Sequence, residues 1–274
     1  MKPGPLGLAA LVAYLLAPVG RAAEPDPAPT PLTRAHAHND YEHVRPLWDA
    51  LDQGFCSVEA DIYLVNGQLL VAHDRNQVKP ERTLQALYLD PLAKRIQENG
   101  GRVFKGGPPE ILLIDVKSDA DSTYKALREV LRQYTNVLTR FAGERVETNA
   151  LTAIISGNRA RQIMAEEAVR YAALDGRPED LNGAVPKQLI PLVSEDWKRL
   201  FKWRGIGPFP ASEKQRLCDL VSRAHAQERT VRFWGTPDRV EIWREELSCG
   251  VDLLNADDLP GLRKFLIAHQ DGRH

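Results

Sequence analysis

Histidines and acidic residues concentrate in one stretch of the sequence, Ala35–Asp74, which holds four of the chain's seven histidines. Within this stretch Glu59 and Asp61 form a Glu-x-Asp pair that lies between His38 and His73. The run around the pair, FCSVEADIYL, is typical of a strand, where residues two apart point to the same face. Two carboxylates so close repel each other unless a cation lies between them. We therefore expect a divalent cation here, Ca²⁺ or Mg²⁺, because both prefer oxygen ligands.

Groups suited to proton transfer and substrate binding accompany this pair. His38 and His73 are candidates for general acid and general base, since an unperturbed imidazole titrates near neutrality. Asp115 and Lys117 share a face of a later run, ILLIDVKS. We expect Lys117 either to contact a phosphate or to keep Asp115 ionised, and the sequence leaves both open. Trp234 ends another apolar run and forms either a wall of the binding pocket or part of the core.

Short apolar runs that alternate with helix-like runs must position these groups. Such alternation favours a parallel sheet with right-handed crossovers. Seven or eight units in about 240 residues predict a (β/α)₈ barrel, in which functional side chains gather at the C-terminal ends of the strands. We find no phosphate-binding glycine motif after any strand, which counts against nucleotide-binding folds. The predicted strands are Thr33–Ala37, Phe55–Tyr63, Leu69–His73, Ile111–Lys117, Leu151–Ser156, Tyr171–Leu174, Ile190–Val193, Thr230–Trp234 and Val251–Asn255.

The helix-like runs separate these strands along the chain. Several begin with a capping residue or with a proline in the first turn. The predicted helices are Val44–Gln53, Pro91–Gln97, Ser122–Val137, Arg159–Val169, Ser212–Gln227, Pro237–Ser248 and Leu259–His269.

Composition sets the broad class of the protein. The chain has 274 residues, 43% of them hydrophobic, and a formal net charge of −1. This balance is that of a globular domain and gives no support to nucleic-acid binding, which needs a basic face. Three cysteines are an odd number. We expect Cys56 to be a free core residue, whereas pairing of Cys218 with Cys249 cannot be read from their positions.

The first residues read as an export signal with a positive start, a short apolar run and small residues before a cleavage site. We predict a signal peptide at residues 1–22, a flexible proline-rich lead-in at 23–31 and a single barrel domain at 32–274. The apolar run is too short for a comfortable membrane span. The expected product is a periplasmic or secreted protein without a transmembrane anchor, and its oligomeric state is left open.

The site residues resemble the superfamily of glycerophosphodiester phosphodiesterases and phosphatidylinositol-specific phospholipases C. In that superfamily a His ends the first strand, Glu-x-Asp lies on the second, a second His follows, and a carboxylate lies on the third strand. The matching residues here are His38, Glu59, Asp61, His73 and Asp115. The resemblance implies a metal-dependent phosphoric diester hydrolase that acts on a small-molecule or lipid-derived phosphodiester.

Further motifs resemble one branch of that superfamily more closely. HNDY resembles the His-Asn pair of eukaryotic phospholipases C, which would make Asn39 an additional metal ligand, and Lys117 fits the glycerophosphodiesterase pattern. HNDYEHVRPL, SVEADIYL, TLQALYLDPL, FWGTPD and GVDLLNADDL resemble the fungal family called altered inheritance of mitochondria protein six and its bacterial relatives. This match runs from about Ala35 to about Leu262.

The chain also departs from the glycerophosphodiesterase pattern, and other functions stay open. His38-Asn39-Asp40 replaces the usual His-Arg-Gly, so the arginine expected to touch phosphate is missing there, and Asp115 stands where Glu is more usual. His36-Ala37-His38 also reads as the His-x-His of metal-dependent amidohydrolases, although few histidines follow to complete such a site. A third alternative is a barrel that binds phosphoesters without turning them over.

Overall fold

Among the residues that the computed structural model describes, which are Met1 and 29–270, eight strands run parallel in a nearly closed barrel. The barrel closes through an isolated bridge between Arg232 and Leu253. The prediction of a (β/α)₈ barrel is confirmed. The strands, in their order around the barrel, are β11 (Thr230–Trp234), β10 (Leu192–Asp196), β9 (Ala172–Gly176), β7 (Leu151–Gly157), β4 (Glu110–Val116), β2 (Ser57–Val65), β1 (Ala35–Ala37) and β12 (Leu254–Ala256).

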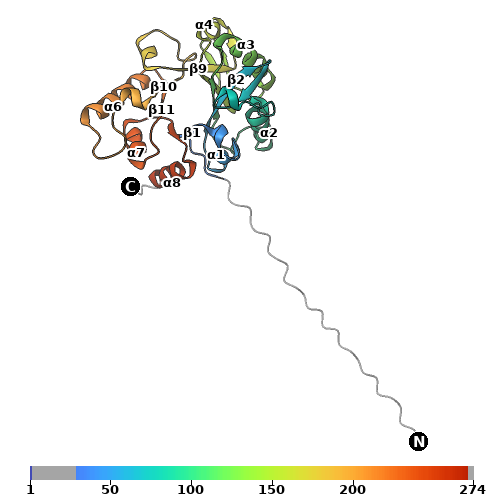
Figure 1. Cartoon of the computed structure of the whole chain (residues 1–274), viewed down its shortest axis with the longest axis horizontal. Coiled ribbons are helices and arrows are strands. Elements are labelled where there is room, and N and C mark those ends of the chain that lie inside the picture. Colours follow the sequence, from blue (N-terminus) through green and yellow to red (C-terminus); the bar gives the residue numbers. More distant parts are fainter. Residues whose placement is uncertain (2–28, 271–274) are drawn as a thin grey trace.

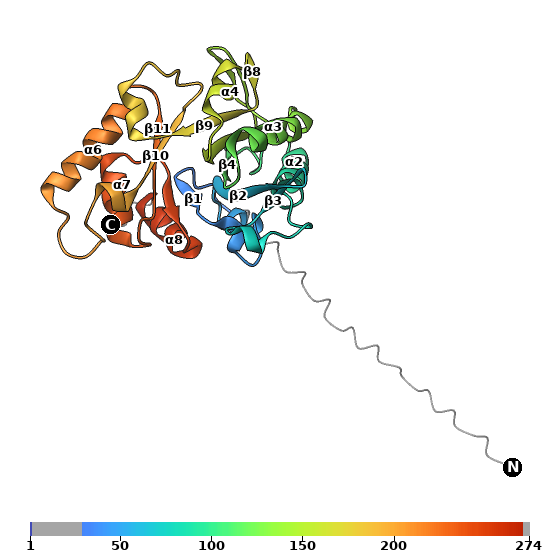
Figure 2. The ribbon, with the colours of Figure 1, turned by 45° about the horizontal axis from the view of Figure 1, so that its top comes forward.

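Helices surround the strands as an outer ring, which two views of the chain show clearly (Figures 1 and 2). Amphipathic sequences explain this placement, because the helices bury one face against the strands. In α3, for example, Tyr124, Leu127 and Leu131 are buried, and the Asp119 side chain caps the helix by accepting a hydrogen bond from the Ser122 amide. The helices are α1 (Trp48–Asp52), α2 (Asp90–Glu98), α3 (Ala120–Leu131), α4 (Arg161–Glu166), α5 (Trp197–Leu200), α6 (Ala211–His225), α7 (Val240–Cys249) and α8 (Leu259–Gln270).

Two predicted helices are shorter in the structure, one of them because of a small antiparallel sheet that lies outside the barrel. It consists of β6 (Arg145–Glu147), β5 (Arg140–Ala142) and β8 (Val169–Arg170). The helix predicted to reach Val169 ends at Glu166, because the next residues pair with β5. The helix predicted to reach Val137 ends at Leu131 and continues only as a short 3₁₀ turn. Pairing with β5 overrides helical periodicity in the first case, and in the second the chain turns so that Leu138 bridges to Leu151 of β7.

The barrel interior has two layers of different chemistry. Its lower layer is a small apolar cluster of Leu113, Ile154, Leu192 and Leu253, separate from the main core between strands and helices. Above this layer the inward side chains are polar, and they occupy the C-terminal ends of the strands. Side-chain alternation produces this contrast: on β4, for instance, Leu113 and Asp115 lie on the same face. The apolar layer therefore forms the floor of a polar cleft.

A β-hairpin extends one side of the barrel and returns the chain to the site. β2 continues into β3 (Gln68–Val71) through a turn at Asn66 and Gly67, both with positive φ. Asn and Gly are the residues that adopt this conformation most readily. Ile62 pairs with Val71, so the chain after β3 runs back past Asp61 and brings His73 close to it.

Two further features of the fold are the state of the cysteines and the lack of a membrane-spanning helix among the described residues. Cys218 of α6 and Cys249 of α7 form a disulfide, while Cys56 is free and buried, as expected. No helix within residues 29–270 combines the length and apolarity that a membrane span would require.

Candidate active site

Three carboxylates from two neighbouring strands meet at the C-terminal end of the barrel. Asp61 of β2 pairs in register with Asp115 of β4, and Glu59 lies two residues earlier on the same face of β2. One oxygen from each of the three lies within 4.8 Å of the others. Only glycine fits beside them at position 157, where φ is +67° and a Cβ would lie 2.0 Å from Asp115 Oδ1. The glycine at position 157 therefore allows β7 to approach Asp115 of β4 closely.

The donor set of this carboxylate triad (Glu59, Asp61, Asp115) fits a divalent cation. The Oδ1 atoms of Asp61 and Asp115 are buried without a hydrogen-bond partner among the described residues. Burial, together with the charges of Glu59 and Asp115, raises the pKa of Asp61. Burial also raises the pKa of Asp115, despite the opposing charge of Lys117. A cation ligated here would pair the orphan oxygens and neutralise the repulsion, and oxygen ligands of this kind suit Mg²⁺ and Ca²⁺.

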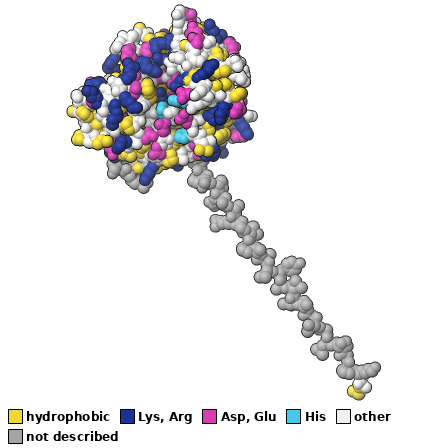
Figure 3. Space-filling view, viewed as in Figure 1, with side chains coloured by type: hydrophobic (Ala, Val, Ile, Leu, Met, Phe, Trp, Pro, Cys, Tyr) yellow, Lys and Arg dark blue, Asp and Glu magenta, His cyan; other side chains and the backbone are white. Residues whose placement is uncertain are grey.

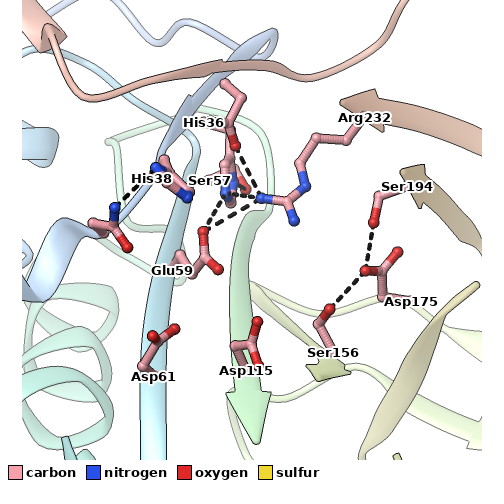
Figure 4. A network of polar contacts seen from close by, with 12 residues as sticks. His36, His38, Ser57, Glu59, Asp61, Asp115, Ser156, Asp175, Ser194 and Arg232 are labelled. Carbon is pink, nitrogen blue, oxygen red and sulfur yellow. Dashed lines mark hydrogen bonds and ion pairs between the residues drawn. The ribbon is translucent and has the colours of Figure 1, made fainter. Parts of the chain in front are cut away.

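A buried network holds Glu59 from behind (Figure 4). Arg232 Nη1 lies 2.7 Å from His36 Nε2 and 3.4 Å from Glu59 Oε2, and it donates to Asn255 Oδ1 at 3.0 Å. His36 Nδ1 lies 2.7 Å from the Ser57 hydroxyl. Burial and the Arg232 charge lower the pKa of His36 to about 4, so the ring is neutral and accepts at Nε2. Although burial opposes ionisation of Glu59, the charge of Arg232 holds the pKa of that carboxyl well below its usual range.

His38 faces the cleft with one ring nitrogen already engaged. Its Nδ1 lies 2.8 Å from Asp257 Oδ1 and 3.1 Å from the Asn39 amide nitrogen. Burial disfavours the charged ring, but the bond to Asp257 and the nearby Glu59 charge raise the pKa of His38 above its usual value. With Nδ1 donating to Asp257, Nε2 is the nitrogen left for the cleft.

His73 reaches the site through a tyrosine that also contacts Asp61. Its Nδ1 lies 3.0 Å from the Tyr41 hydroxyl and 3.4 Å from Asp61 Oδ2. The hydroxyl lies 2.7 Å from Asp61 Oδ2 and 2.8 Å from Asn39 Oδ1. Asn39 itself has φ of 47°, a left-handed conformation that asparagine tolerates better than most residues. Tyr41 thus ties Asn39, Asp61 and His73 together.

Lys117 and Trp234 also line this cleft, whose volume is about 540 Å³. The Lys117 ammonium lies 3.0 Å from Asp61 Oδ2 and 3.4 Å from Asp115 Oδ2, so it pairs with Asp61 as well as with Asp115, the carboxylate named in one of the two alternatives for Lys117. Trp234 is half-buried at the end of β11 and contributes to the wall. On the surface, histidine and acidic side chains gather near the middle of the face viewed in Figure 3.

All eight predicted site residues come together, but the sequence reasoning gave no role to several neighbours. Seven of the eight line the cleft, and Asp61 lies directly behind it in contact with Lys117 and Tyr41. Arg232 was missed, although it lies two residues before Trp234 in the apolar run VRFW and so shares its face. Asp257 and Tyr41 were also missed. His36 does not line the cleft, because both its nitrogens are engaged behind Glu59.

Comparisons with known proteins give the family and the fold of the chain. The model of the AIM6-like phosphodiesterase domain family matches residues 29–175. Altered inheritance of mitochondria protein 6 from Eremothecium gossypii is 33% identical over 85% of this chain and 69% of its own length. A homologue from Arthroderma benhamiae is 29% identical over 97% of this chain and 100% of its own. A glycerophosphodiester phosphodiesterase crystal structure from Parabacteroides distasonis has a similar fold, with a TM-score of 0.54 at 15% identity, covering 88% of this chain and 99% of that one.

These comparisons correct one prediction. The expectation of an exported, periplasmic or secreted protein is wrong, because the relatives are named for the inheritance of mitochondria. The signal peptide predicted at residues 1–22 and most of the proline-rich lead-in lie outside the residues that the structure describes.

Proposed function

This chain belongs to the family of AIM6-like phosphodiesterase domains, and from that premise we propose that it is a metal-dependent phosphoric diester hydrolase. One observation carries the proposal: Glu59 and Asp115 of the carboxylate triad line one cleft together with His38 and His73, and the cleft is large enough for a small ester. The substrate is a phosphodiester, either a free small molecule or one derived from a lipid. Each residue has a distinct part in the chemistry.

Glu59, Asp61 and Asp115 would hold the divalent cation, Ca²⁺ or Mg²⁺, and Asn39 is a further candidate ligand. When bound there, such a cation would offset the charge that grows on the phosphoryl oxygens and lower the pKa of the attacking hydroxyl. The support for this ligand set is the pair of orphan Oδ1 atoms on Asp61 and Asp115. Lys117, which now pairs with both carboxylates, would instead be available to contact the phosphate.

His38 is suited to the role of general acid. Asp257 accepts from its Nδ1 and, with Glu59, favours the charged ring, so a proton is held at Nε2 on the cleft side. From there it can pass to the leaving alkoxide. Asp257 orients the ring and sets its tautomer, and it does not itself need to touch the substrate.

His73 is suited to the role of general base. The Tyr41 hydroxyl has a single proton, and the nearest charged acceptor is Asp61 Oδ2 at 2.7 Å. The hydroxyl oxygen is then free to accept from His73 Nδ1 at 3.0 Å. This tautomer leaves His73 Nε2 without a proton, so it can take one from the nucleophile. Trp234 would provide an apolar wall beside the substrate.

The amidohydrolase alternative has no comparable support. It needs His36 and His38 as a pair of metal ligands, and His36 Nε2 lies 2.7 Å from a guanidinium nitrogen. A cation beside a ring nitrogen excludes a metal ion from the same position. The alternative of a non-catalytic phosphoester-binding barrel differs from hydrolysis only in turnover, so a direct assay decides between them.

The test is hydrolysis of bis(p-nitrophenyl) phosphate by the purified chain with Mg²⁺ or Ca²⁺, and again after exhaustive treatment with EDTA. We expect turnover that EDTA abolishes and re-added cation restores. Glu59→Gln should abolish it, whereas Glu179→Gln, a matched change outside the cleft, should not. Turnover that survives chelation would remove the metal from the proposal. Binding of phosphoesters without any turnover would establish the non-catalytic barrel instead.

A further inference from the structure

One guanidinium group in the cleft has no part in the proposed mechanism. Arg177 follows β9 and lines the cleft with its side chain 22% exposed. Its Nη1 donates to Asp175 Oδ2 at 2.9 Å, to the Gly176 carbonyl at 2.8 Å and to Ser194 Oγ at 3.3 Å. All these contacts use the same nitrogen, and neither Nε nor Nη2 is among the buried unpaired atoms. Nε and Nη2 have no hydrogen-bond partner among the described residues and are partly exposed, so they are left to donate to a molecule in the cleft that Arg177 lines.

A buried polar network fixes Arg177 in this orientation. Asp175 is fully buried, and its Oδ2 accepts from Ser156 Oγ at 2.7 Å and from Ser194 Oγ at 2.6 Å. Figure 4 shows these three side chains meeting from neighbouring strands. Charged hydrogen bonds of this kind, once satisfied, order the groups that make them. The guanidinium group of Arg177 is therefore already oriented before a ligand binds.

The surroundings of Arg177 carry excess positive charge. Arg159 donates to the backbone carbonyl of Asp175, and Arg161 binds both oxygens of Asp180. These three guanidinium groups face two carboxylates, which leaves one positive charge without a partner within the group. Burial and the charge of Arg177 both lower the pKa of Arg159, which is the expected effect of crowded cations. An anion in the cleft would relieve that repulsion.

The position of Arg177 separates it from the proposed reaction centre. The triad lies on β2 and β4, and β7 stands between β4 and the strand that precedes Arg177. Arg232, on the next strand but one, is already engaged by Glu59 and His36. A phosphoryl group at the triad therefore leaves Arg177 free to bind a different part of the substrate.

We propose that Arg177 forms a second anion-binding subsite, which selects phosphodiesters whose one alcohol arm carries a carboxylate or a phosphomonoester. This inference rests on the proposed hydrolase function and specifies its substrate class. A guanidinium with two open nitrogens suits both anions, because each can accept two parallel hydrogen bonds.

Two matched pairs of water-soluble esters test the subsite. Glycerophosphoserine differs from glycerophosphoethanolamine by one carboxylate, and glycerophosphoinositol 4-phosphate differs from glycerophosphoinositol by one phosphate. In at least one pair, the wild-type chain should prefer the anionic member by about tenfold in kcat/KM, mainly through a lower KM. Arg177→Gln should bring that ratio close to one. Arg199→Gln, a control on an exposed arginine paired with Glu195 and outside the cleft, should preserve it.

The pair that shows the preference identifies the anion. Equal kcat/KM values in both pairs would overturn the subsite while leaving hydrolysis intact, and so would a preference that survives Arg177→Gln. If none of the four esters is hydrolysed, calorimetric binding of the same four applies. If an anionic member binds more tightly and Arg177→Gln abolishes this preference, the subsite stands although the hydrolase proposal fails. Equal binding within both pairs would refute the subsite as well as the hydrolase proposal.

Loss of Arg177 alone leaves Asp175 charged and buried, which can unfold the chain. The double variant Asp175→Asn/Arg177→Gln removes both charges, keeps the size of the buried residue 175 and shortens only the partly exposed residue 177. Its melting temperature should lie near that of the wild type, and its kcat/KM ratio should fall close to one in the same way. A folded double variant that keeps the wild-type preference would refute the subsite.

Discussion

Replacing Asp115 with asparagine separates the metal-binding role of the triad from its effect on folding. The change keeps the size and shape of the side chain and removes one of three negative charges that lie within 4.8 Å of one another. We expect the variant to bind the cation more weakly while its metal-free form is as stable as the wild type or more stable. The reason is that the charge that helps to hold a cation is also a source of repulsion without it.

The structure gives the size of both effects. Two unit charges 4.8 Å apart repel by about 3.5 kcal/mol at an effective dielectric constant near 20. The three oxygens lie no farther apart than this distance, whereas the Lys117 ammonium, 3.4 Å from Asp115 Oδ2, offsets part of the repulsion. A cation at a hundred times its wild-type Kd stabilises the wild type by about 2.7 kcal/mol, and a variant with hundredfold weaker affinity by only about 0.4 kcal/mol.

Unfolding in urea, followed in EDTA and again with saturating Mg²⁺ or Ca²⁺, measures both effects. Asp115→Asn should show a smaller cation-dependent increment than the wild type and an equal or higher free energy of unfolding in EDTA. Glu110→Gln is the matched control, since Glu110 begins the same strand and is buried away from the triad. It should leave the increment unchanged. A full increment in Asp115→Asn, with a large loss of stability in EDTA, would make Asp115 a structural residue.

Further predictions concern the histidines and the buried acids. His38→Asn or His73→Asn should each lower turnover by about 10²–10⁴ without lowering the melting temperature, whereas His43→Asn, outside the cleft, should change turnover little. Asp257→Asn should lower kcat and move the basic limb of the pH–rate profile to lower pH, because Asp257 helps to raise the pKa of the proposed acid His38; an unmoved limb would contradict that role. Glu246 is fully buried, neither of its oxygens has a partner among the described residues, and burial raises its pKa well above the usual value. Its favourable contribution is complete below the unfolded pKa near 4.3 and is lost as pH rises towards the folded pKa, at about 1.4 kcal/mol per pH unit. Between about pH 5 and pH 6 the wild type should therefore lose that much more unfolding free energy than Glu246→Gln, and parallel pH profiles would refute the assignment.

Much of the barrel was predictable because most strands can be recognised from their own short stretch of sequence. Runs such as ILLI at the start of ILLIDVKS are apolar on both faces, and helices follow these runs with recognisable starts. The predicted strand limits are correct to within a few residues at most ends; Ile111–Lys117, for example, is Glu110–Val116 in the structure. The small sheet of β5, β6 and β8 was not predicted. Its strands have only two or three residues, and β8 exists because it pairs with β5, about thirty residues earlier.

In the same way, some features of the site follow from residues close in sequence, and others depend on contacts between residues far apart in sequence. The spacing of Glu59 and Asp61 fixes their common face, and the barrel prediction then places Asp115 beside them. The contact between Arg232 and His36 joins residues 196 positions apart, and that between His38 and Asp257 joins residues 219 apart. Neither follows from spacing along the chain, because the barrel must close before these strand ends become neighbours.

His36, which suggested a metal-ligating pair with His38, instead affects the triad through its contact with Arg232. His36 is neutral and accepts from Arg232, which keeps the guanidinium beside Glu59 rather than in the open cleft. Glu59 therefore stays ionised whether or not a cation is present, whereas burial raises the pKa of both Asp61 and Asp115. Two carboxylates on one strand thus differ because Glu59 faces a fixed guanidinium, whereas at Asp61 burial and the charges of Glu59 and Asp115 outweigh the Lys117 ammonium. It follows that Glu59 is the preset anion of the triad, and that Asp61 and Asp115 have the most to gain from a bound cation.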